Sequence, residues 1–212
     1  MISINGKQAF IARQFDSLTG AYSLNTTASE NTITDDPREY ALTLQQAKEI
    51  LPVNTNVHDA YIQMLLEATT EQVERYIALD TYEKTRRSIW VRPATKVLLP
   101  YGIHGAINSV ISRTYDNQDT TLVANDDYYV HGSDFKWLEI VSGLDEYLII
   151  TFKSGYTAGN CPASIRMGIM QELSLQYKNR QDPNATQRVV VNGLSVEARN
   201  LLTPFIRYVL WR

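Results

Sequence analysis

The chain has 212 residues, of which 44% are hydrophobic and 20% charged, and this composition is typical of a folded globular protein rather than a disordered one. Its net charge of −3 argues against a general nucleic-acid-binding protein, and it has no run of about 18 apolar residues that would predict a membrane-spanning helix. Residues 1–80 carry 5 basic and 11 acidic side chains, whereas residues 162–212 carry 7 and 3. This split fits either a molecule that docks head to tail or chance clustering on solvated faces.

Residues 1–40 are rich in Ser, Thr, Asn and Asp and contain scattered apolar residues. This composition predicts an N-terminal extension or arm with short strands near residues 8–15, and a disordered tail is the alternative. The first ten residues, MISINGKQAF, lack the apolar segment and the cleavage site of a secretory signal. We therefore expect the protein to be made in a reducing, intracellular compartment.

From Thr43 onward the pattern predicts two helices. Thr43 and Gln46 have the spacing of a capping box, which predicts a short helix over about residues 43–51. A long helix is predicted over about residues 57–79, with Asn56 as its N-cap. Its apolar face is predicted to comprise Val57, Tyr61, Met64, Leu65, Ala68, Val73, Tyr76 and Ile77.

Residues 84–161 contain short runs of β-branched and aromatic residues separated by turns bearing Asn, Asp and Gly. The close spacing of these runs predicts a compact antiparallel β-sheet of four to six strands. In the last run, Leu148, Ile150 and Phe152 alternate with more polar positions, so we expect them to share one face of the sheet.

A second long helix is predicted over about residues 163–180, because Ile165, Ile169, Leu173 and Tyr177 recur at helical spacing. A last short helix is predicted over about residues 195–203, with Ser195 as its cap, Glu197 in its first turn and Pro204 ending it. We expect the long helices to pack together. The predicted class is therefore α+β: a helical bundle formed by residues 41–83 and 162–203, with an antiparallel β-sheet inserted at 84–161.

The sequence contains no recognisable catalytic, cofactor or metal site. The three histidines, His58, His104 and His131, lie in different segments, and none has metal-ligand spacing to another. Asp126 and Asp127 are adjacent, so their side chains are expected to point apart in an Asp-rich turn. The single cysteine, Cys161, precedes a proline and has no evident base. We predict that the protein is not an enzyme and binds no cofactor or metal.

Residues 204–212 form a predicted C-terminal anchor tail. Large apolar side chains dominate this stretch, and two arginines are interleaved with them. Burying each large apolar side chain contributes roughly 1.5–3 kcal/mol, so the stretch is expected to fold onto the protein's own core or to insert into a partner. Aromatic and arginine side chains are also enriched in interface hot spots. The predicted residues of this partner interface are Phe205, Ile206, Arg207, Tyr208, Leu210 and Trp211.

The order of these elements resembles the head–tail connector (adaptor or head-completion) proteins of tailed bacteriophages. The resemblance covers about residues 41–207 and rests on LTLQQAKEIL, DAYIQMLLEATTEQVERYI, LLPYGIHGAINSVISRTY, IITFKSGYTAGNCPASIRMGIMQELSLQYKNR and LLTPFIR. It implies a structural virion protein that forms a ring, usually of twelve subunits, below the portal protein. The implied partners are the portal, tail or stopper proteins, other copies of the chain, and double-stranded DNA passing through the channel without sequence specificity. No membrane partner is implied.

A function of another class stays open at this point. The competing hypothesis is a ligand- or polysaccharide-binding β module carried on a helical scaffold, or an enzyme of unrecognised type. Such a module would be a monomer with a concave aromatic pocket, and Trp90, Trp137 and Tyr129 are its candidate lining residues. Sheet core or sheet-face packing is the alternative role for these three side chains.

Overall fold

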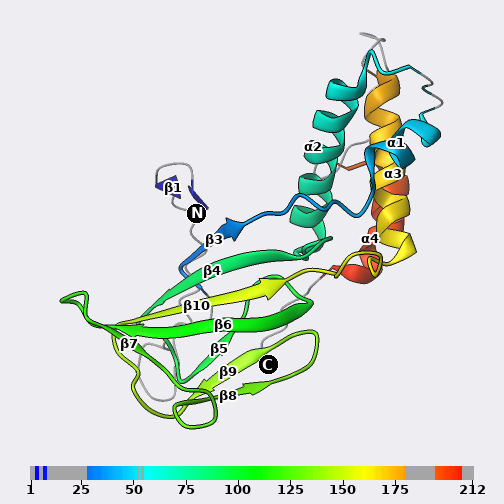
Figure 1. Cartoon of the computed structure of the whole chain (residues 1–212). Helices are drawn as coiled ribbons and strands as arrows, with labels where there is room; N and C mark the ends of the chain where they lie inside the picture. The colour runs from blue at the N-terminus through cyan, green and yellow to red at the C-terminus, as the bar shows by residue number, and fades with distance from the viewer. Residues whose placement is uncertain are drawn as a thin grey trace. The chain divides into compact units, whose positions relative to one another are not determined.

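The structure is a computed structural model, and it describes residues 3–4, 7–8, 28–51, 53, 55–179 and 194–206. The chain divides into a β unit, within residues 1–36 and 84–155, and a helical unit, within residues 37–83 and 156–212 (Figure 1). The predicted mixed α+β class is confirmed. None of the described helices is long and apolar enough to cross a membrane.

All four predicted helices are present in the helical unit, and each bound lies within two residues of its prediction. They are α1 (Leu44–Ile50), α2 (Asp59–Ile77), α3 (Ala163–Asn179) and α4 (Val196–Leu202). A single 3-10 turn, η1 (Thr203–Phe205), follows α4, with Pro204 in its first positions. Proline is tolerated there because the first turn of a helix leaves its N–H groups unpaired.

Two of the three N-caps predicted from the sequence are confirmed. The capping box is confirmed, since Thr43 Oγ1 accepts from the Gln46 N–H at 3.2 Å and Gln46 Oε1 accepts from the Thr43 N–H at 3.0 Å. Ser195 Oγ caps α4 by accepting the N–H of Ala198. The cap predicted for α2 is wrong: His58 holds the N-cap position, and Asn56 Oδ1 accepts instead from the Lys48 ammonium at 2.7 Å.

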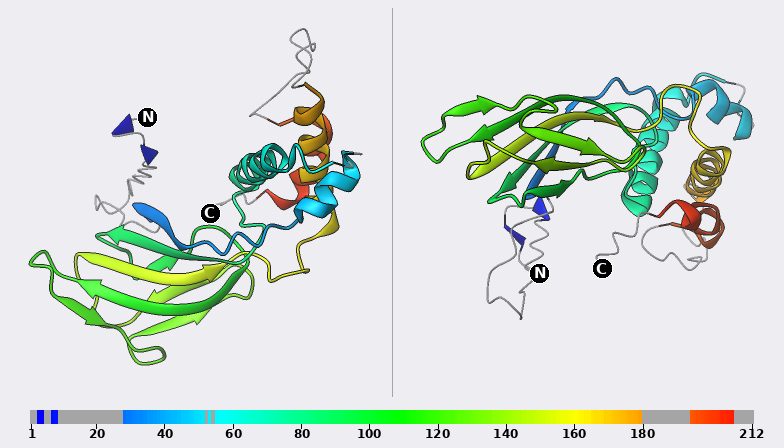
Figure 2. Two further views of the ribbon diagram at one scale, coloured as in Figure 1. Left: turned by 45° about the horizontal axis from the view of Figure 1, so that its top comes forward. Right: turned by 90° about the horizontal axis from the view of Figure 1, so that it is seen from below.

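The two long helices pack together, as predicted. Ile165, Ile169 and Leu173 of α3 are fully buried in the same core as the inner face of α2, and Gln176 Nε2 donates to Gln72 Oε1 at 3.0 Å. Helix α4 lies beside α3 in every view (Figures 1 and 2). Gly168 permits this approach, because a Cβ there would meet the Leu202 side chain at 3.0 Å.

The described part of the β unit contains two antiparallel sheets besides a short hairpin, so the prediction of a single inserted sheet is wrong. The strands are β1 (Ser3–Ile4), β2 (Lys7–Gln8), β3 (Glu30–Asp35), β4 (Lys84–Val91), β5 (Lys96–Leu98), β6 (His104–Arg113), β7 (Asp119–Thr121), β8 (Tyr128–His131), β9 (Trp137–Ile140) and β10 (Tyr147–Ser154). One sheet has the order β3-β4-β10-β6-β7 and the other the order β5-β9-β8. β1 pairs with β2, and the rest of the strand predicted near residues 8–15 lies outside the described residues.

The two larger sheets share one core because both present alternate side chains to the space between them. Leu148, Ile150 and Phe152 of the central strand β10 are fully buried, which confirms the predicted face. Leu138 and Ile140 of the smaller sheet are buried in the same cluster. Strand β3 pairs with β4 at the edge of the larger sheet, so part of the predicted N-terminal arm contributes to the β unit.

Candidate subunit interface

The two histidines of the β unit, His104 and His131, make contacts that support the fold. His104 is buried, with Nδ1 accepting the Lys136 N–H at 2.9 Å and Nε2 lying 3.0 Å from the Pro100 carbonyl oxygen. His131 stacks on Trp137 with ring centroids 4.1 Å apart. Within the described ranges, no group of three or more His, Cys, Asp or Glu side chains could hold a metal ion.

Asp127 organises two loops. Its carboxylate accepts the Val123 N–H at 2.8 Å and the Ser142 hydroxyl at 2.6 Å, and the bond from Ser142 is the main reason that the pKa of Asp127 is lowered. These contacts are those of a turn-forming aspartate whose side chain bonds nearby backbone. Of the two adjacent carboxylates, Asp127 therefore holds the loop in place.

Cys161 lies in the helical unit and is buried. Burial raises the pKa of its thiol to about 12. Because the thiolate is the nucleophilic form of cysteine, this environment suppresses the reactivity of the side chain.

The aromatic pocket considered for a ligand-binding module is not formed, which corrects that alternative. Trp90 is fully buried in the core between the sheets. Trp137 pairs in register with His131, and Tyr129 with Glu139, so these side chains share a face of the smaller sheet. That face is opposite the buried Leu138, because neighbouring residues of a strand point to opposite sides. Trp90 and Trp137 therefore do not line one cavity.

The apolar face predicted for α2 is divided between two sides of the helix. Val73 and Ile77 are fully buried, as expected, but Val57 and Met64 are 82% and 59% exposed. Met64 and Val73 are nine residues apart, which is two and a half turns at 3.6 residues per turn, so they project in opposite directions. The buried face is completed instead by Ile62, Leu66, Thr69 and Thr70.

Exposed apolar residues on the other side of the helix, two of which belong to the predicted face, make up what we call the outer face of α2. It comprises Ala60, Met64 and Ala68, which are exposed and four residues apart, and the exposed Val57 lies in the turn before the helix. Glu71 and Arg75 continue the same side towards the end of the helix. An apolar stripe that the protein's own core leaves uncovered is a recognised mark of a protein–protein contact.

The predicted C-terminal anchor lies only partly within the described residues. Phe205 and Ile206 are half-buried and pack against the core of the helical unit. The other predicted interface residues lie outside the described residues: Arg207, Tyr208, Leu210 and Trp211. The two described members thus contact their own protomer.

A family model described as "HCP: Head completion protein" matches residues 41–211. The chain belongs to the head completion protein family. The match begins at the residue where the sequence resemblance begins, and it confirms the identification as a head–tail connector or head-completion protein. No curated protein matches the chain.

Solved structures show the same fold. One chain from the neck of an empty gene transfer agent (GTA) particle, computed with C6 symmetry, is 13% identical with a TM-score of 0.69 over 86% of this chain and 97% of that chain. A chain from the virion of a native GTA particle is 14% identical, with a TM-score of 0.68 over 85% and 97%. A chain from the neck of a native GTA particle, computed with C12 symmetry, is 12% identical, with a TM-score of 0.67 over 86% of this chain and 97% of that chain.

Proposed function

We propose that this head completion protein is a structural virion protein that forms a homo-oligomeric ring, of twelve subunits, at the junction of head and tail. Its family and its likeness to neck proteins in particles with C6 and C12 symmetry support this proposal. In this role the ring lies below the portal, extends the DNA channel and offers a platform for tail or stopper proteins. The protein needs surfaces for this function and no catalytic site.

The observation that carries the proposal is the outer face of α2. Burying an exposed Val or Met side chain contributes roughly 1.5–3 kcal/mol, and a ring repeats the gain at every subunit boundary. Apolar side chains are also exposed elsewhere in the helical unit, at Met167 of α3 and at Val196 at the start of α4. Because Met167 is two residues from the fully buried Ile165 and Ile169, it points away from the core. Exposed apolar side chains on different helices suit a head-to-tail contact that closes into a ring.

Four further roles belong to the proposal. The helical bundle of residues 41–83 and 162–203 forms the repeated wedge of the ring, and the β insertion at 84–161 projects towards neighbours or the tail. Residues 1–40 supply an additional arm, and residues 204–212 anchor each subunit in the portal. Multiple weak anchors held in one ring strengthen the attachment by their effective concentration. The excess of acidic residues in 1–80 and of basic residues in 162–212 favours the same head-to-tail order.

Substitution of Met64 tests the ring contact. Met64→Glu places a charge in the proposed interface, so it should abolish ring formation, measured by mass photometry of the protein alone and mixed with the portal. Val141→Glu is the matched control, because Val141 is an equally exposed apolar residue, at 61%, but lies in the β unit. Both variants should keep the wild-type melting temperature. Normal rings from Met64→Glu would show that the outer face of α2 is not the contact.

Truncation tests the anchor separately. Deleting residues 207–212 spares Phe205 and Ile206, which pack on the helical core. The shortened chain should therefore melt at the wild-type temperature and still form rings, but lose affinity for the portal. Unchanged portal affinity would exclude the anchor role, whereas a large fall in melting temperature would assign these residues to the protein's own core.

A further inference from the structure

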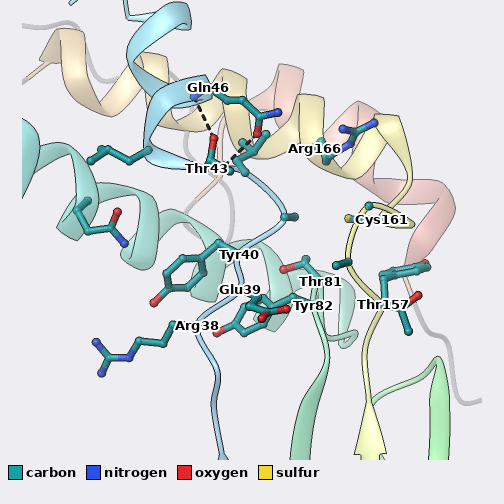
Figure 3. Close-up of a pocket in the computed structure, with 17 residues that line it drawn as sticks. Arg38, Glu39, Tyr40, Thr43, Gln46, Thr81, Tyr82, Thr157, Cys161 and Arg166 are labelled. Atoms are coloured by element: carbon teal, nitrogen blue, oxygen red, sulfur yellow. Dashed lines mark hydrogen bonds between the residues drawn. The ribbon is translucent and has the colours of Figure 1, made fainter.

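A cavity of about 480 Å³ lies within the helical unit (Figure 3). Its volume falls in the range of ligand-binding pockets, about 300–1,000 Å³. Four segments line it: residues 38–46, the turn at 81–82, the stretch at 156–161, and Arg166 of α3. Gln63 of α2 also lines it.

The lining of this cavity combines aromatic rings with positive charge. Tyr40 and Tyr82 contact each other edge to face with their ring centroids 5.1 Å apart, and Cys161 lies across the cavity from them (Figure 3). Arg38, Glu39 and Arg166 are the charged side chains of the lining, so its net charge is +1. This combination suits an aromatic side chain that is accompanied by a carboxylate.

Arg166 gives the strongest indication that an acceptor binds here. Its Nε atom is removed from solvent, and no acceptor within the described part of the chain lies in hydrogen-bond range. A buried donor without a partner costs roughly 1–3 kcal/mol, and more when the group is charged. A carboxylate from a partner would satisfy this donor with a charge-assisted hydrogen bond.

The loop between β8 and β9 carries an aromatic side chain next to a carboxylate. Asp134 and Phe135 are both exposed, Phe135 by 45%. Lys136 in the same loop donates its ammonium group to the Gly105 carbonyl oxygen, which leaves Asp134 as the charge at the tip. No salt-bridge partner of Asp134 exists among the residues that the structure describes.

This loop is held in a defined conformation before it binds anything. Gly132 has a φ of +86°, and a Cβ at this position would lie 2.3 Å from the Phe135 carbonyl oxygen, so the turn requires glycine. The Asp134 carbonyl oxygen accepts the His104 N–H at 3.0 Å. A preorganised loop loses less conformational entropy on binding than a flexible one.

We propose that the β8–β9 loop of one subunit docks in the helical cavity of a second copy, with Phe135 against the Tyr40–Tyr82 pair and Asp134 on Arg166. The inference rests on the proposed ring and names one contact that closes it. The supporting observations are the opposite charges, the unpaired Nε atom and the exposed Phe135. Each subunit supplies one loop and one cavity, as a head-to-tail ring requires.

A photo-crosslinking experiment tests the occupant directly. Phe135 is replaced by p-benzoylphenylalanine in the full chain, and the assembled protein is irradiated. We expect a product of doubled mass on denaturing gels, with the crosslink mapped by mass spectrometry to residues 38–46 or 156–166. Tyr129 is the control position, because it is similarly exposed, at 44%, but lies outside the loop. Rings that form normally without a Phe135 crosslink to the cavity would overturn this contact and leave the proposed ring intact.

A charge exchange tests the ion pair. Asp134→Lys and Arg166→Glu should each weaken subunit association by about tenfold or more, and the double variant should recover most of the loss. Asp116→Lys, at an exposed carboxylate of the β6–β7 turn, should associate like the wild type. A double variant no better than either single variant would overturn the pairing of Asp134 with Arg166. A wild-type chain that stays monomeric both alone and with the portal would overturn the proposed ring and this contact together.

Discussion

Glu172 joins two helices of the helical unit, and its replacement should weaken their attachment. The side chain is 3% exposed on α3, where Oε2 accepts the Ser195 N–H at 2.9 Å and Oε1 accepts from Gln176 Nε2 at 3.1 Å. Ser195 is also the N-cap of α4. Glu172→Ala therefore removes both acceptors and leaves a buried N–H at the cap without a partner.

The expected cost can be worked from these two bonds. A hydrogen bond to a charged group contributes roughly 1.5–3 kcal/mol, and an unsatisfied buried donor costs roughly 1–3 kcal/mol, so we expect a loss of about 3 kcal/mol for Glu172→Ala. For a chain of this size that corresponds to a fall in melting temperature of roughly 6–12 °C. Glu172→Gln should cost less, because its amide keeps one acceptor oxygen for the two donors.

Urea unfolding followed by the helical signal in circular dichroism measures the effect. Gln171→Ala is the control on the same helix, because Gln171 is exposed, and it should change the free energy of unfolding by less than about 0.5 kcal/mol. Equal stability of Glu172→Ala and Gln171→Ala would refute the reasoning. It would show that the two bonds to Glu172 contribute nothing net to the attachment of α4.

Two further predictions concern buried groups of the helical unit. The Thr69 hydroxyl is buried without a hydrogen-bond partner among the described residues, whereas the Thr81 hydroxyl donates to Glu74 at 2.9 Å. In urea titrations, Thr69→Val should keep or raise the stability by up to about 1 kcal/mol, and Thr81→Val should lower it by about 1–2 kcal/mol; equal losses would contradict this. Burial raises the pKa of Cys161 from 9.0 to about 12, so at about pH 8 iodoacetamide should label the folded protein at least roughly a thousandfold more slowly than the protein unfolded in urea. Rapid labelling of the folded chain would refute the raised pKa of Cys161. The same shift in pKa should make the free energy of unfolding fall as the pH rises from about 9 to about 12, because the thiol of the unfolded chain loses its proton first.

Local signals in the sequence determined where most helices begin and end. The Thr43–Gln46 capping box and the Ser195 cap act within one turn, so their residues suffice to predict them. The i, i+4 spacing of Ile165, Ile169 and Leu173 likewise predicts the buried face of α3, because the helix has one apolar side. The prediction of Asn56 as the N-cap of α2 failed because the Asn56 side chain accepts a hydrogen bond from Lys48 instead.

The division of the strands into two sheets required the tertiary structure. Short β runs specify extended backbone, but their partners lie far away in sequence, as for β3 and β4 or β5 and β9. The same limit applies to the tryptophans, since Trp90 is buried between the sheets and Trp137 lies on an outer face. Residue type alone does not distinguish a core aromatic residue from one on a sheet surface.

The candidate interface depends on the sequence and on the tertiary structure in different ways. The sequence determined that α2 carries more apolar residues than one face can hold, and it placed Asp134 beside Phe135 and an arginine at position 166. Only the tertiary structure decided that Val73 faces the core while Met64 faces solvent, and that Arg166 lines a cavity. The physical reason is that periodicity fixes the angles between side chains around a helix, whereas the direction of the whole helix depends on what it packs against.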